Sequence, residues 1–140
     1  APEYVLASYT SKRAEVSLDD LGYRQLVSLY RALASCPGVA APVVVDASDL
    51  SAAPGVVLKA LCARIGIGYT DDMLTWAPGP RPEDGIWARH WYAAVRRSNG
   101  LEPKPRAALP ELEPKLADIA RAARPLYEEL AAARLIVAPG

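Results

Sequence analysis

His90 is the side chain best suited to general-base chemistry near neutral pH, and it is the only histidine among the 140 residues. A catalytic imidazole normally has a further polar group that orients it. The neighbours of His90 on a helix include no acid, since they are Ile86, Trp87, Ala93 and Ala94. We therefore predict that His90 is structural or exposed, and we assign no catalytic residue within this chain.

The acidic residues and cysteines do not form a recognisable metal-binding pattern. The adjacent pairs Asp71-Asp72 and Glu128-Glu129 supply fewer oxygen ligands than a hard cation needs, so we interpret them as helix-start or surface charges. Cys36 and Cys62 lack metal-ligand spacing and form no framework of paired bridges. The sequence therefore predicts no metal site and two buried free thiols.

The charge balance argues against two classes of partner. Sixteen basic residues offset sixteen acidic ones, whereas nucleic-acid binders normally carry a basic excess. No apolar run approaches the roughly 18–20 residues that cross a bilayer. With 51% hydrophobic residues, the composition is typical of a globular protein. We expect a cytoplasmic protein that binds neither nucleic acid nor membrane.

Apolar spacing predicts that helices make up most of the chain. The clearest stripe is Leu26, Leu29, Tyr30 and Leu33, which follow one another at helical intervals and should face the core. Ser17 should cap the start of this helix with its hydroxyl, and Gly66 should end a later helix in the left-handed conformation. The predicted helices cover residues 2–13, 17–35, 54–65, 71–76, 86–98 and 112–134, the last with a kink or restart at Pro125.

One segment, residues 42–46, is predicted to be a strand. Its three consecutive valines, Val43, Val44 and Val45, suit a strand that is covered on both faces, usually in a parallel sheet. Such a strand needs neighbours, and residues 135–137 are too short to be a convincing one. We expect its partner strands to lie elsewhere, and an unpaired apolar strand of this kind favours self-association.

Two Pro-rich segments separate the remaining elements. Residues 77–85 contain three prolines and two glycines and should form a loop, while residues 101–110 should form a linker to the terminal helix. We predict that residues 1–140 form a single partial domain.

Three segments, in this order, resemble P-loop sulfotransferases, most closely those of a bacterial branch. Residues 2–9 are similar to the family segment R-x-P-x-x-x-x-x-S-Y, in which Ser8 occupies the serine and the arginine would precede Ala1. Residues 43–50, with Pro54 and a helix that runs to residues 65–67, are similar to the family's strand, acidic turn and following helix. Residues 79–87 resemble its basic loop R-K-G-x-x-G-x-W.

In that loop Arg81, Gly85 and Trp87 match the family pattern, whereas Pro80 and Pro82 depart from it. The resemblance covers residues 2–100. It implies an α/β fold, of which this chain is the helix-rich C-terminal portion of a P-loop NTPase-like, three-layer arrangement with one clear strand.

The resemblance also implies a nucleotide-binding site for 3′-phosphoadenosine 5′-phosphosulfate, the sulfuryl donor. Ser8, Arg81 and Gly85 are the implied cofactor-binding residues; the alternatives are a solvated hydroxyl at Ser8 and a solvated charge at Arg81. The family's Gly-rich cradle has no counterpart here, since the chain contains no G-x-x-x-x-G-K-S/T motif. The implied function is sulfuryl transfer to a hydroxyl or amine of a small-molecule acceptor, with this chain inactive alone.

A different class of function remains open on the sequence: a non-catalytic helical interaction domain whose valine strand pairs with a partner chain. Two further alternatives concern the basic loop. The loop is either a lid with Arg81 at its tip or a rigid Pro-rich connector. The aromatic cluster Trp87, Trp91 and Tyr92 is predicted to pack in the core, with a base-stacking platform as the alternative.

Overall fold

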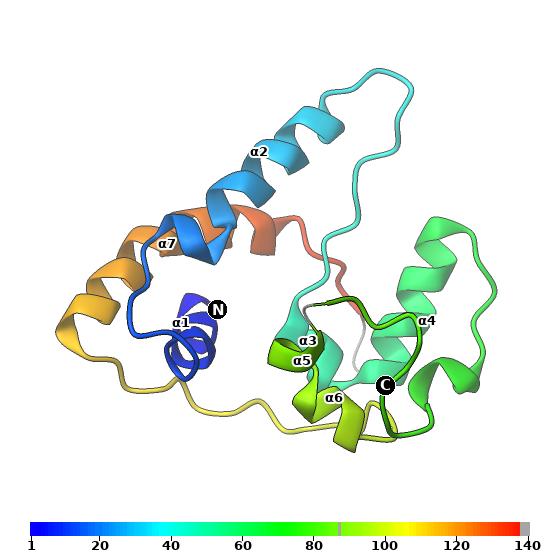
Figure 1. The fold of residues 1–140 in the computed structure, drawn as a ribbon. Helices are drawn as coiled ribbons and strands as arrows, with labels where there is room; N and C mark the ends of the chain where they lie inside the picture. Colours follow the sequence, from blue (N-terminus) through cyan, green and yellow to red (C-terminus); the bar gives the residue numbers. More distant parts are fainter. Residues whose placement is uncertain (87, 138–140) are drawn as a thin grey trace. The chain divides into compact units, whose positions relative to one another are not determined.

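The computed structural model describes residues 1–86 and 88–137 (Figure 1). The chain divides into two compact units. Unit 1 contains Ala1–Ser48 and Arg106–Ile136, and unit 2 contains Asp49–Pro105 with Val137. Whether the two units act as the single partial domain expected from the sequence stays a prediction.

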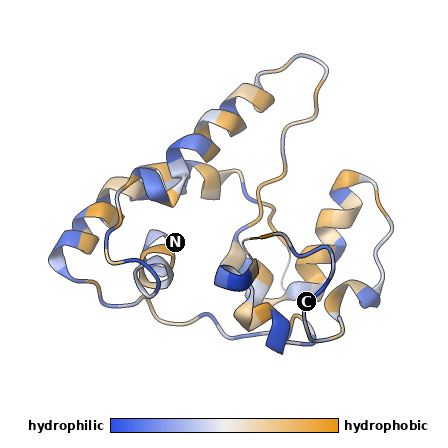
Figure 2. Cartoon of the chain, viewed as in Figure 1, coloured by the Kyte–Doolittle hydropathy of each residue, from blue (hydrophilic) through white to orange (hydrophobic). Residues whose placement is uncertain are grey.

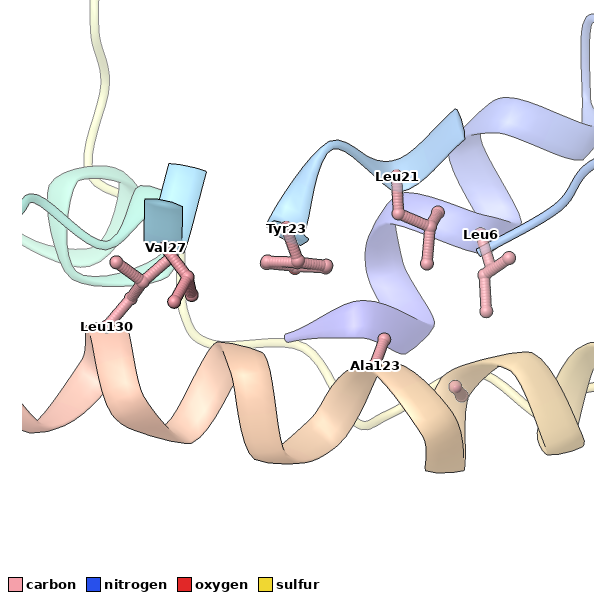
Figure 3. Close-up of a cluster of buried hydrophobic side chains, with 7 residues drawn as sticks. Leu6, Leu21, Tyr23, Val27, Ala123 and Leu130 are labelled. Atoms are coloured by element: carbon pink, nitrogen blue, oxygen red, sulfur yellow. The ribbon is translucent and has the colours of Figure 1, made fainter. Parts of the chain in front are cut away.

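Unit 1 is built on the long helix α7, Pro114–Ala132, which remains one helix although Pro125 lies inside it. Helices α1, Pro2–Thr10, and α2, Tyr23–Ala34, both pack on α7, and the short 3-10 helix η1, Asp19–Leu21, joins them. Figure 3 shows Leu6 and Leu21 above Ala123 and the side chains of Val27 and Leu130 next to each other. The buried core comprises Leu6, Leu21, Tyr23, Val27, Ala120, Ala123 and Leu130.

The face of α2 that meets the core is not the face that its sequence indicates. Tyr23 and Val27 are buried, whereas Leu26, Leu29 and Leu33 are 51%, 57% and 39% exposed. Figure 2 shows apolar positions continuing along the C-terminal half of α2. Tyr30, the fourth residue of the predicted stripe, does pack against the core. The prediction was wrong for the three leucines because helical spacing identifies an apolar face without identifying what covers it.

The predicted strand at residues 42–46 is wrong in extent. Within the described residues it is reduced to one isolated parallel bridge between Val44 and Arg134. The amide of Leu135 donates to the carbonyl of Val44 at 2.7 Å, so the C-terminal segment does provide a partner. The described residues are thus helix-rich, as predicted, with almost no strand. Whether they belong to a three-layer fold whose other strands lie elsewhere stays a prediction.

Unit 2 contains shorter helices. Helix α4, Pro54–Ile65, contacts the 3-10 helix η2, Asp71–Leu74, and ends at Gly66, whose φ of 75° confirms the predicted left-handed cap. Helix α3, Ala47–Ala52, spans the boundary between the units, where the sequence suggested only a turn. Residues 101–113 contain neither helix nor strand.

The helix predicted at residues 86–98 is interrupted in the structure. Helix α5 covers Ala88–Trp91 and helix α6 covers Ala93–Arg97. Tyr92 has φ −94° and ψ 9°, so its ψ is far from the helical value and breaks the regular turn.

Two local predictions are also corrected. The Ser17 hydroxyl does not cap a helix; it donates to the Asp20 carboxylate at 2.6 Å, as the Ser17 amide does at 2.8 Å. Cys62 is buried as predicted, but Cys36 is exposed. Among the described helices, none combines the length and apolar character needed to cross a membrane.

Candidate functional site

The basic loop in unit 2 is organised around a turn from Arg81 to Asp84. The Asp84 amide donates to the Arg81 carbonyl at 3.1 Å, which closes the turn, and Pro82 occupies a position where its fixed φ is favourable. The Arg81 amide donates back to Asp84 Oδ2 at 3.2 Å. These two hydrogen bonds fix the backbone of Arg81, whereas the Arg81 side chain is exposed.

Asp84 connects this turn to helix α6. Its Oδ2 accepts from Arg96 Nε at 3.0 Å and from Arg96 Nη2 at 2.8 Å, and the Asp84 side chain is 15% exposed. The hydrogen bonds from Arg96, followed by the one from the Arg81 amide, hold the pKa of Asp84 below its ordinary value. Asp84 therefore stays ionised and keeps the loop joined to α6 at neutral pH.

Backbone hydrogen bonds hold the beginning of the same loop. The Gly79 amide donates to the Arg96 carbonyl at 2.8 Å, and the Trp76 amide donates to the Asn99 carbonyl at 2.9 Å. Gly79 has φ 117°, a conformation that side-chain-bearing residues rarely adopt. The loop is thus joined to the α6 region both before and after Arg81.

A pocket of about 470 Å³ opens beside this loop. Trp76, Arg81, Asp84, Tyr92 and Arg96 are among the residues that line it. Two guanidinium groups against one carboxylate give the lining a positive balance, which suits an anionic ligand. The indole N–H of Trp76 is buried and has no hydrogen-bond partner among the described residues.

The three residues expected to contact the nucleotide fall in different units. Arg81 and Gly85 lie in the loop of unit 2, and both are exposed. The Arg81 guanidinium makes no hydrogen bond within the described part of the chain, unlike that of Arg96. A Cβ at Gly85 would meet nothing within 4 Å, so no contact inside the described structure requires glycine there.

Ser8 lies on α1 in unit 1 and is exposed. Its carbonyl accepts from the Ser11 hydroxyl at 2.7 Å, whereas its own hydroxyl makes no hydrogen bond to the residues that the structure describes. The hydroxyl of Ser8 is therefore available to a ligand or to water.

The aromatic residues after the loop depart from the prediction. Trp91 and Tyr92 are 39% and 44% exposed, so core packing is wrong for both. Trp87 lies outside the described residues. His90 is exposed, as predicted, and accepts a hydrogen bond from Arg89 Nε at 2.9 Å.

Asp46 is a half-buried carboxylate of unit 1 that joins two segments distant in sequence. Its Oδ2 accepts from the Tyr127 hydroxyl at 2.8 Å, and its Oδ1 accepts from the Ser48 amide at 2.7 Å. Burial raises the pKa of Asp46, but these hydrogen bonds outweigh it and the net pKa is lowered. Asp46 therefore has a structural role in joining α7 to residues 46–48.

The neighbouring Tyr23 also has a shifted pKa. Burial, with smaller contributions from Tyr127, Asp46 and Glu3, raises the pKa of Tyr23 to about 12.

Sequence reasoning missed the residues that hold the loop: Gly79, Asp84 and Arg96. Asp84 and Arg96 are twelve positions apart on either side of a helix break, a spacing that no local periodicity reveals. Gly79 carried a usable signal, because a glycine in a Pro-rich loop often marks a positive φ. In the described residues no group of three or more His, Cys, Asp or Glu side chains could hold a metal ion.

Residues 1–134 match the family described as the sulfotransferase domain. Two proteins of Arabidopsis thaliana are similar to part of the chain. Branched-chain-amino-acid aminotransferase-like protein 1 is 42% identical over 82 residues, which is 59% of this chain and 14% of that protein. Branched-chain-amino-acid aminotransferase-like protein 2 is 39% identical over 85 residues, or 61% of this chain and 15% of that protein.

The chain therefore spans about 15% of the length of these curated relatives. No solved structure matches it.

Proposed function

The chain belongs to the sulfotransferase domain family, and from that premise we propose that it forms part of a cytoplasmic enzyme of sulfuryl transfer. The donor in this proposal is 3′-phosphoadenosine 5′-phosphosulfate, and the acceptor is a hydroxyl or amine of a small molecule. The family match over residues 1–134 is the observation that carries the proposal.

Arg81 is the residue that we propose contacts the donor's phosphate. Its guanidinium is exposed and makes no hydrogen bond within the described residues, so it can present its planar fork to two phosphate oxygens. The turn closed by Asp84 holds the backbone of Arg81, which lowers the entropy lost when the side chain is ordered by a ligand. Gly85, which follows, leaves the backbone open to close approach.

Ser8 would supply a second, weaker contact. An exposed hydroxyl without an internal partner can donate to a phosphate oxygen without breaking a hydrogen bond of the folded chain. Ser8 and Arg81 belong to different units, so the two contacts are testable independently of each other.

The remainder of the catalytic machinery is proposed to come from polypeptide outside these 140 residues. Sulfuryl transfer depends on positioned cations and backbone N–H groups around the transferred group. The chain contains no G-x-x-x-x-G-K-S/T loop, and its only histidine lies on an exposed site beside Arg89. The residues present therefore bind and orient the donor; they do not transfer the group.

The test is a titration of the 140-residue chain with adenosine 3′,5′-bisphosphate, the donor product, followed by amide shifts in NMR spectra. We expect shifts at residues 81–85 and at Ser8 that saturate only in the millimolar range, about −4 kcal/mol of binding free energy. Arg81→Ala should abolish the shifts in the loop. Arg97→Ala is the matched control, because Arg97 is an exposed arginine of α6 that does not line the pocket.

Two results would contradict the proposal. Loop amides that do not respond to the nucleotide, or that respond equally in Arg81→Ala, would remove Arg81 from the site. Product formation by the 140-residue chain above the blank, with donor and a panel of phenols and alcohols, would show that no further machinery is required.

A non-catalytic interaction domain is the second candidate, and one observation favours it: Leu26, Leu29 and Leu33 expose an apolar face on α2. The titration separates the two candidates. An interaction domain without a nucleotide role gives no response at residues 81–85, whatever it binds through α2.

A further inference from the structure

Asp84 places a carboxylate in a pocket whose two guanidinium groups, those of Arg81 and Arg96, suit an anion. Its contacts within the folded chain use only one of its two oxygens. Oδ2 accepts from Arg96 Nε at 3.0 Å, from Arg96 Nη2 at 2.8 Å and from the Arg81 amide at 3.2 Å. A single oxygen of Asp84 therefore joins the loop to α6.

The second oxygen, Asp84 Oδ1, accepts no hydrogen bond from the residues that the structure describes. It is not buried either, because the buried polar side-chain atoms without a partner in that part of the chain are Glu3 Oε2 and Trp76 Nε1. The Asp84 side chain is 15% exposed and lines the pocket. Part of this exposed surface therefore belongs to an open, charged acceptor on the pocket lining.

The charges of Asp84 and Arg81 interact. The hydrogen bonds from Arg96 and from the Arg81 amide are the larger causes of the lowered pKa of Asp84, and the charges of the two guanidinium groups add to them. An ionised carboxylate thus stands beside the guanidinium that we propose binds a phosphate. It repels a bare phosphate at Arg81, but it attracts a ligand that carries a hydrogen-bond donor next to the phosphate.

A ribose with a 3′-phosphate has such a donor, because its 2′-hydroxyl is on the adjacent ring carbon. The phosphate oxygens accept from Arg81, and the 2′-hydroxyl donates to Asp84 Oδ1 without breaking a hydrogen bond of the described chain. Arg81 cannot replace Asp84 in this role, because a guanidinium has no acceptor. A 2′-deoxyribose offers the same phosphate but lacks the donor.

We propose that Asp84 makes this site selective for ribonucleotides with a 3′-phosphate: its Oδ1 accepts a hydrogen bond from the 2′-hydroxyl while Arg81 binds the phosphate. The inference rests on the proposed function, because it takes the 3′-phosphate of the donor to be the one that Arg81 contacts. It adds recognition of the sugar to the recognition of the phosphate.

The experiment compares adenosine 3′,5′-bisphosphate with 2′-deoxyadenosine 3′,5′-bisphosphate. Each is titrated into the 140-residue chain and followed by the amide shifts of residues 81–85. We expect the deoxy compound to bind about fivefold more weakly, as for the loss of one hydrogen bond to a partly exposed group. The ratio of the two dissociation constants is the measured quantity, because a loosened loop changes both constants and leaves their ratio unchanged.

Asp84→Ala removes the acceptor, so the ratio should fall to about one, even though the loss of the pair with Arg96 also loosens the loop. Glu83→Gln is the matched control, because Glu83 is an exposed carboxylate of the same turn that does not line the pocket. It removes one negative charge near the phosphate and should leave the ratio unchanged. Amide shifts of α4 that match those of the wild-type chain verify that unit 2 remains folded in both variants.

The outcomes distinguish this inference from the proposed function. Loop amides that respond to neither nucleotide contradict both. Equal affinity for the two nucleotides in the wild-type chain overturns the selection of ribose and leaves Arg81 as a phosphate contact. A ratio that Asp84→Ala retains overturns the inference as well, because another group then recognises the hydroxyl. A ratio that is lost in both variants overturns it too, because the charge of the turn then sets the preference. A ratio lost in Asp84→Ala and retained in Glu83→Gln supports it.

Discussion

Replacement of Tyr127 by phenylalanine should measure how strongly the Asp46 carboxylate joins α7 to residues 46–48. The Tyr127 hydroxyl donates to Asp46 Oδ2 at 2.8 Å, and Tyr127→Phe removes this hydrogen bond while keeping the ring. A hydrogen bond to a charged group contributes roughly 1.5–3 kcal/mol. Because Asp46 is half-buried, water can replace part of the contact, so we expect a loss of about 1–2 kcal/mol in the free energy of unfolding.

Urea unfolding is the assay, with thermal melting as a second measure. A loss of about 1 kcal/mol lowers the melting temperature by roughly 4–8 °C in a domain of 60–100 residues. Tyr30→Phe is the matched control, because Tyr30, like Tyr127, packs against the core of unit 1 and its hydroxyl makes no hydrogen bond in the described structure. Equal stability of Tyr127→Phe and Tyr30→Phe would refute the reasoning.

The pH dependence provides a separate check on the same bond. The pKa of Asp46 in the folded chain is below its ordinary value of 3.8, so its ionised form is favoured by folding. The contribution is therefore complete above about pH 5 and is lost as the pH falls through the folded pKa. We expect the difference between the wild-type chain and Tyr127→Phe to shrink below pH 4; a difference that grows there would show that the sign is wrong.

Three further changes test other parts of the structure. Gly100→Ala should cost about 1–3 kcal/mol in urea unfolding, because a Cβ there would lie 2.5 Å from a backbone oxygen. Gly68→Ala, with nothing within 4 Å, should change little. Leu6→Ala should cost about 2–5 kcal/mol because Leu6 is fully buried, and a smaller loss would place it outside the core. Asp84→Asn removes the carboxylate that pairs with Arg96, so amide hydrogen exchange in the preceding turn should accelerate at neutral pH. In the wild-type chain the same loss of protection, measured relative to the intrinsic exchange rate at each pH, should occur only below pH 4, since the pKa of Asp84 is lowered and the pair is lost as the pH falls through it.

The parts of the fold that the sequence predicted are those set by local chemistry. Gly66 ends α4 with φ 75°, and the helices at residues 54–65 and 112–134 form close to the expected positions. Each depends on interactions within a few residues: glycine's access to positive φ, proline in a first turn, and helical spacing.

The parts that the sequence did not predict depend on which surfaces meet. The buried face of α2 carries Tyr23 and Val27, next to the more conspicuous stripe of leucines, because α7 covers only the first of these faces. The pairing of Val44 with Arg134 joins residues 90 positions apart, and no pattern near either residue indicates it. In the candidate site, Arg81 could be selected by resemblance, whereas the hydrogen bonds that link its turn to Asp84 and Arg96 depend on how the loop folds back on α6.

Two features, the Arg81 guanidinium and the three exposed leucines of α2, are not explained by contacts within the described residues. In each case a binding partner would explain why these residue types are present. A guanidinium held on a closed turn, with a charge attraction to Asp84 but no internal hydrogen bond, is available to an anion. The three exposed leucines lie on the side of α2 that α7 does not cover, and exposed apolar surface of this kind is unfavourable unless another surface covers it. The two features lie in different units and call for different chemistry, an anion in one case and an apolar surface in the other. Leu29→Glu should therefore leave the nucleotide response of residues 81–85 unchanged. Loss of that response in Leu29→Glu would show that a single surface, rather than two, explains both features.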